Sequence, residues 1–145
     1  AAVNFLKRIG MNNIRTHEKE LISYTLKQEE ESGIKNLISY GTRNIESRAG
    51  IYAFNVGEIP RLGINPLADE GISFMIKAIH PHDLSAIADR IFGVELRSGH
   101  HCAMPMTEDL GVTSTVRASY YIYNRKEDID RLFDAIRAGI KRFGL

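Results

Sequence analysis

The chain has 145 residues, about one domain by the usual size range, and 43% of them are hydrophobic, which is enough for a modest core. A formal net charge of +1 gives no reason to expect a nucleic acid or an anionic membrane as a partner, and no apolar run approaches the roughly 18 residues of a membrane span. The single cysteine cannot form an internal disulfide, which fits a reducing cytoplasm.

The N-terminal half predicts two helices followed by two strands. Residues 1–9 place apolar side chains on one helical face and end at Gly10, and they begin without a Met, so we expect a piece of a larger protein. A second helix is predicted from Asn12 or Asn13 to about Glu31, with a solvated face rich in Glu, Lys and Gln. Strands are predicted at residues 37–40 and 51–56, with a polar turn at 42–50.

The C-terminal half predicts shorter elements and one clear helix. Residues 58–71 are predicted as a loop, 72–79 as a strand, 81–90 as a helix, 94–96 as a short strand and 114–123 as a longer strand. The last helix is predicted to start after an N-cap at Asn124, with Glu127 completing a capping box. Its apolar stripe is interpreted as core and comprises Ile129, Leu132, Phe133, Ile136, Ile140 and Phe143. The sum predicts an α+β fold with a small antiparallel or mixed sheet and helices on one side.

The run from Arg97 to Pro105, Arg-Ser-Gly-His-His-Cys-Ala-Met-Pro, holds the only cysteine. His100 and His101 can carry positive charge, Arg97 is near in sequence, and Pro105 predicts a helix start, so all these features favour a thiolate at Cys102. We therefore interpret Cys102 as a nucleophile. The alternative is a buried cysteine that acts as a small hydrophobic residue.

Two other chemistries fit this segment less well. Neighbouring side chains diverge, so adjacent His-His-Cys is a poor set of ligands for one metal; His80 and His82 could join it, but there is no C-x-x-C pair, and no metal site is predicted. A Cys-His hydrolase needs a third orienting group and an oxyanion hole, and nothing in the sequence specifies either.

Arg117 is the second residue of interest, because it lies in the middle of a predicted strand between Val116 and Ala118. A charge there is costly to bury unless it is paired, and a bidentate clamp on a substrate carboxylate would supply the partner. An arginine on an edge strand that faces solvent is equally compatible with the pattern.

Several of these segments resemble a known family. The Arg97–Pro105 run is followed by Leu110-Gly-Val, then by Val116-Arg-Ala-Ser-Tyr-Tyr-Ile-Tyr-Asn124 and by Glu127-Asp-Ile-Asp-Arg-Leu132. Together they resemble the C-terminal part of the Suf-type (group II) cysteine desulfurases and selenocysteine lyases, which are pyridoxal-phosphate enzymes of the class V aminotransferase fold. The R-x-G-H-H-C-A string is the specific part of the match, and residues 51–57 and 10–14 extend it more weakly.

The resemblance implies a reaction and a set of site residues. Such enzymes take sulfur from L-cysteine as a persulfide on their own cysteine, release alanine, and pass the sulfur to an acceptor protein for iron–sulfur cluster assembly. By position Cys102 would be the nucleophile, with His100 as a second catalytic residue. Arg117 would bind the substrate α-carboxylate with support from Arg97, and His101 is the weaker match. The parent enzyme would be a cytoplasmic homodimer.

The same resemblance implies that this chain lacks the domain that binds the cofactor. The family's Schiff-base lysine and cofactor phosphate ligands lie in a large domain N-terminal to this part, so residues 1–145 would be one small C-terminal domain that binds no cofactor and is inactive alone. The stretch 58–79 is longer than the family's usual link. Alternatives left open are a stand-alone sulfur carrier or protein-interaction module, selenocysteine lyase activity, and a transaminase or kynureninase-like lyase on the same fold.

Overall fold

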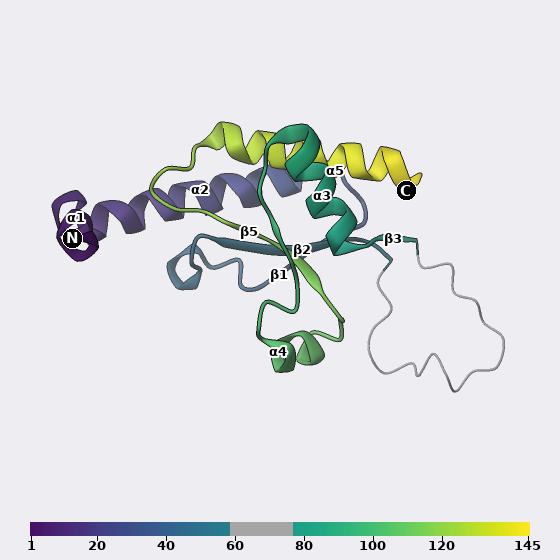
Figure 1. Cartoon of the computed structure of the whole chain (residues 1–145), viewed down its shortest axis with the longest axis horizontal. Coiled ribbons are helices and arrows are strands. Elements are labelled where there is room, and N and C mark those ends of the chain that lie inside the picture. Colours follow the sequence, from purple (N-terminus) through teal and green to yellow (C-terminus); the bar gives the residue numbers. More distant parts are fainter. Residues whose placement is uncertain (59–76) are drawn as a thin grey trace.

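The computed structural model describes residues 1–58 and 77–145, and Figure 1 shows its elements along the chain. In chain order they are α1 (Ala2–Ile9), α2 (Met11–Glu31), β1 (Leu37–Tyr40), the 3-10 helix η1 (Ile45–Ser47), β2 (Ile51–Gly57), β3 (Ala78–Ile79), α3 (Pro81–Phe92), β4 (Arg97–Gly99), α4 (Met104–Asp109), β5 (Thr115–Ser119) and α5 (Lys126–Phe143). None of the described helices is both long and apolar enough to cross a membrane.

The sheet runs in the order β1-β2-β5-β4, with β3 paired to the end of β2, and every pairing is antiparallel. Helices α2, α3 and α5 gather on one side of it. Helix α4 belongs to the connection between β4 and β5 and lies away from these three helices (Figure 1). The α+β prediction with helices on one side is therefore confirmed, and the sheet is antiparallel rather than mixed. β5 is an interior strand, because β2 and β4 flank it.

The core forms between the sheet and the helices. Tyr52 and Phe54 of β2 are fully buried, with ring centroids 5.1 Å apart, and the register places them opposite Ala118 and Val116 of β5. Since side chains alternate across a strand, the residues between them belong to the other sheet face. Arg117 is one of these, so it lies on the face away from the core.

The predicted strand at 94–96 is wrong, because β4 begins three residues later, at Arg97. Helix α3 ends at Gly93, whose φ of 63° turns the chain, and the Val94 N–H donates to the Ala88 carbonyl. Val94 and Leu96 then pack against the core as partly buried side chains. Their apolar character reflects this packing and not a place in the sheet.

The start of α5 also differs from the prediction. β5 ends at Ser119, and the Asn124 side chain accepts a hydrogen bond from the Tyr121 N–H, so Asn124 stabilises a turn instead of capping the helix. The N-cap is Arg125, whose N–H donates to the Asp128 carboxylate at 3.0 Å. The capping box is thus displaced by one residue, and Asp128 replaces Glu127 in it.

The apolar stripe of α5 is confirmed in its first part. Its buried members are Ile129, Leu132, Phe133 and Ile136. Ile140 is partly buried, whereas Phe143 is 46% exposed and does not belong to the core. The stripe reaches solvent in the last helical turn, where nothing in the described part of the chain covers it.

The N-terminal elements follow the prediction closely. α2 starts at Met11, directly after Gly10, and Asn13 donates its side-chain amide to Ile9 instead of capping a helix. The predicted turn 42–50 contains η1, and α3 runs two residues beyond the predicted 81–90. Of the predicted loop 58–71 and strand 72–79, only Glu58, Lys77 and β3 are described, and the rest lies outside the described residues.

Candidate active site

The cysteine lies on a tight turn between β4 and α4. Gly99 has a φ of 115°, and His101 and Cys102 both adopt left-handed backbone angles, with φ of 57° and 59°. The turn is closed by a 2.8 Å hydrogen bond from the Ala103 N–H to the His100 carbonyl. Non-glycine residues adopt this conformation at a cost of roughly 1–2 kcal/mol each, and such strain concentrates at functional sites.

The thiol of Cys102 is exposed, so the alternative of a buried hydrophobic cysteine is wrong. Arg97, at the start of β4, donates from Nη2 to Sγ at 3.2 Å. A hydrogen bond from a guanidinium is stronger when the acceptor carries negative charge. Arg97, which is near Cys102 in sequence, is therefore also in contact with its thiol.

Arg117 is in the interior strand β5, so the alternative of a solvent-facing arginine on an edge strand is wrong. The β4–β5 register places it directly opposite Arg97, and the two therefore share one sheet face. Its side chain is half-buried, and its Nε is buried without a hydrogen-bond partner among the residues described. The structure thus brings Arg97, Arg117 and Cys102 together.

His101 differs from the prediction in its charge. Its Nε2 lies 2.8 Å from the Thr115 hydroxyl, a neighbour that sequence reasoning missed, and its Nδ1 is buried. Burial lowers the pKa of His101, and the positive charges of Arg117 and Arg97 lower it further. The lowered pKa disfavours the charged form of His101, contrary to the positive charge expected of it. His100 is exposed on the same turn.

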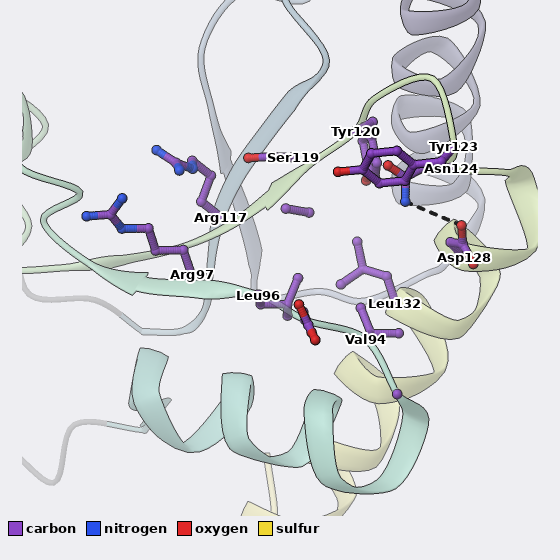
Figure 2. Close-up of a pocket in the computed structure, with 13 residues that line it drawn as sticks. Val94, Leu96, Arg97, Arg117, Ser119, Tyr120, Tyr123, Asn124, Asp128 and Leu132 are labelled. Carbon is purple, nitrogen blue, oxygen red and sulfur yellow. Dashed lines mark hydrogen bonds between the residues drawn. The ribbon is translucent and has the colours of Figure 1, made fainter. Parts of the chain in front are cut away.

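A cavity of about 550 Å³ opens beside the arginine pair. It separates the 93–97 segment from β5, and Figure 2 shows Arg97 and Arg117 at one end and Tyr123, Asn124 and Asp128 at the other. Asn124 donates to Asp128 at 3.4 Å across that far end. Cys102 does not line this cavity, and Arg97 lies between the two.

The polar far end was missed as part of a site, although the sequence carried a partial signal. The alternation within the predicted strand 114–123 places Arg117, Ser119, Tyr121 and Tyr123 on one face, and all of these except Tyr121 line the cavity. The strand ends at Ser119, however, and the turn that follows brings Asn124 and Asp128 to the same place. A turn of this kind is not visible in a strand-like alternation of residues.

Comparison with known proteins places the chain in a family. Residues 62–132 match the class-V aminotransferase family. A probable cysteine desulfurase of Staphylococcus epidermidis is 38% identical over 136 residues, which is 94% of this chain and 27% of that protein. A probable cysteine desulfurase of Halalkalibacterium halodurans is 36% identical over 144 residues, 99% of this chain and 29% of its own length.

Solved structures agree with the sequence matches. The apo cysteine desulfurase of Thermococcus onnurineus NA1 superimposes with a TM-score of 0.73 at 30% identity, over 99% of this chain and 29% of that one. The cysteine desulfurase CsdA of Escherichia coli gives a TM-score of 0.71 at 23% identity, over 97% of this chain and 29% of its own, and shows the same fold. The chain spans less than a third of the length of these relatives. It belongs to the class-V aminotransferase family, and the relatives named above are cysteine desulfurases.

Proposed function

We propose that this chain is the small C-terminal domain of a Suf-type cysteine desulfurase and that Cys102 receives the sulfur. The observation that carries the proposal is the exposed thiol of Cys102, held 3.2 Å from the Arg97 guanidinium on the same side of the sheet as Arg117. The names of the relatives supply the reaction class, since they match over almost the whole chain. The net reaction converts L-cysteine to alanine and leaves a persulfide on Cys102.

Each site residue has a chemical task in this proposal. Arg117 binds the substrate α-carboxylate, because a planar guanidinium forms two parallel hydrogen bonds to a carboxylate. Arg97 stabilises negative charge on the sulfur that it already contacts. His101 holds the turn through Thr115, and His100, exposed on the same turn two residues before Cys102, is the candidate for proton transfer.

The residues described here do not fit the cofactor that the family uses. Pyridoxal phosphate is held by a lysine Schiff base, and no lysine lines the cavity beside Arg97 and Arg117. Lys77, which precedes β3, is exposed and borders neither the cavity nor the thiol. We therefore assign carboxylate binding and sulfur acceptance to this chain, and cofactor binding to the remaining length of the parent protein. The isolated chain is inactive on cysteine.

The sulfur then leaves the enzyme through an acceptor protein. The exposed turn presents Cys102 at the surface, as transfer to a second protein requires. In this proposal the acceptor serves iron–sulfur cluster assembly, and the parent enzyme is a cytoplasmic homodimer. Selenocysteine is a second possible substrate, because selenium in place of sulfur would use the same carboxylate clamp and the same thiol.

The test uses the full-length parent protein, with alanine and persulfide as products. Cys102→Ala is expected to abolish persulfide formation from cysteine, whereas Arg117→Gln is expected to raise KM by about tenfold or more, the loss of a charge-assisted hydrogen bond. Arg142→Gln, on the exposed end of α5, is the matched control of equal charge change. Activity of the Cys102→Ala protein on amino acids without sulfur would instead support a transaminase or lyase.

A second experiment tests the division of labour. The 145-residue chain is incubated with cysteine, pyridoxal phosphate and a reductant, and sulfide is measured against the free cofactor. Release at the background level is expected. Release well above it would show that the chain holds the cofactor by itself and would overturn the assignment.

A further inference from the structure

The surroundings of Cys102 are positively charged, and among the described residues no acid forms an ion pair with Arg97 or Arg117. Arg97 and Arg117 face the same side of the sheet, and both lower the pKa of His101, which places their charges close to the turn. The ion pairs found among the described residues involve other side chains. Glu95 and Asp128 line the neighbouring cavity, and the ion pair that Asp128 forms among the described residues is with Arg131.

We propose that Cys102, Arg97 and Arg117 form a site for sulfur oxoanions, at which the chain takes sulfane sulfur from thiosulfate without a cofactor. Two guanidiniums on one face suit a compact dianion, because each offers paired N–H donors to its oxygens. The activity uses the thiol of the proposed desulfurase but neither its cofactor nor its amino-acid substrate. The two proposals can therefore fail separately.

The geometry favours attack by the Cys102 Sγ on a bound thiosulfate. The Arg97 Nη2 lies 3.2 Å from Sγ, so an anion held by the other guanidinium nitrogens lies beside the nucleophile. The left-handed turn leaves Cys102 exposed, and Arg117 has a buried Nε without a hydrogen-bond partner among the described residues. Holding both reactants at one place converts a slow bimolecular step into a local one.

The transfer balances without an external oxidant or reductant. The Cys102 thiolate attacks the outer sulfur of thiosulfate, a new Sγ–S bond forms, and the S–S bond of thiosulfate breaks. Sulfite leaves with the electron pair of that bond, and Cys102 remains as a persulfide anion, so three negative charges stand on each side. Cyanide regenerates the thiolate by removing the sulfur as thiocyanate.

The experiment uses the 145-residue chain and thiosulfate. Sulfite release and the addition of one sulfur to the intact mass, reversible by a thiol reductant, report loading, and thiocyanate formation reports turnover. Arg97→Gln and Arg117→Gln are each expected to lower the rate constant for thiosulfate by about tenfold, the loss of a charge-assisted hydrogen bond. Arg142→Gln has the same charge change and is expected to match the unmodified chain, and Cys102→Ser is expected to be inactive.

A neutral sulfur donor separates anion binding from general reactivity of the thiol. Dimethyl trisulfide carries no charge, so the ratio of the thiosulfate rate to the trisulfide rate is expected to fall in both arginine variants. The trisulfide reaction also reports whether the thiol is accessible. Circular dichroism shows whether each variant is folded, and a variant that is misfolded is replaced by Arg97→Lys or Arg117→Lys. Sulfate is expected to inhibit the thiosulfate reaction and to leave the trisulfide reaction unchanged.

Two results would overturn the proposal. The first is a thiosulfate rate no higher than that of the urea-unfolded chain at equal thiol concentration. The second is an unchanged rate ratio in folded Arg97 and Arg117 variants. Either result leaves desulfurase activity of the full-length protein intact, since that activity is measured with cysteine and the cofactor.

Discussion

A buried hydrogen bond joins α2 to the end of β5, and its removal has a calculable cost. The Thr25 hydroxyl is 2.9 Å from the Leu21 carbonyl and 3.1 Å from the Tyr120 hydroxyl. Thr25 is 0% exposed and Tyr120 is 8% exposed, so water does not replace a lost partner. Burial raises the pKa of Tyr120, so its phenol is protonated at neutral pH. Thr25→Val keeps the shape and leaves that phenol without its partner.

The expected loss is about 1–3 kcal/mol of unfolding free energy, the usual penalty for an unsatisfied buried polar group. Tyr120→Phe is expected to cost less, about 0.5–1.5 kcal/mol, because Thr25 keeps its bond to Leu21. In the double variant both polar groups are gone, so Thr25→Val then costs little. With a urea m-value of about 2 kcal/mol/M, the single Thr25→Val variant shifts the midpoint by about 0.5–1.5 M. An equal cost of Thr25→Val in both backgrounds would refute this reasoning.

Three further predictions concern the core and the site. Arg48→Met is expected to lower the free energy of unfolding, measured in urea, by about 3–5 kcal/mol, because the buried guanidinium donates to three backbone carbonyls between Tyr40 and Ile51. Arg48→Lys keeps the charge but lacks the planar guanidinium, so its stability is expected to lie between those of Arg48→Met and the unmodified chain. Phe133→Ala is expected to cost about 3–5 kcal/mol in the same assay, against under about 0.5 kcal/mol for the exposed Phe143→Ala, and similar costs would contradict the packing described. Folding lowers the pKa of His101, so the unfolded chain binds a proton at this residue more readily, and the free energy of unfolding falls as the pH drops from the ordinary value of 6.5 through the lowered folded value. His101→Asn is expected to flatten this fall between about pH 7.5 and 5.5. An unchanged slope would show that other groups cause it.

Local patterns in the sequence were enough for most of the fold. The stripe from Ile129 to Ile136 and the glycine-bounded run at 51–56 predicted α5 and β2, because helical and strand periodicities place apolar side chains on one face whatever the partner. The Arg97–Pro105 string likewise predicted Cys102 as the nucleophile. These features lie within short stretches of chain, where the order of residues specifies their relative positions.

Other features depend on contacts between distant segments. Val94 and Leu96 look like a strand but pack against the core outside the sheet, and Asn124 looks like a helix cap but closes the turn after β5. The protonation of His101 depends on distant contacts for the same reason, since burial and Arg117, sixteen positions along the chain, lower its pKa. The sequence alone identified Arg97, Cys102 and Arg117 as candidate site residues. Only the tertiary structure decided that Arg117 lies in an interior strand opposite Arg97, because strand order and register are set by pairing between segments that are remote in sequence.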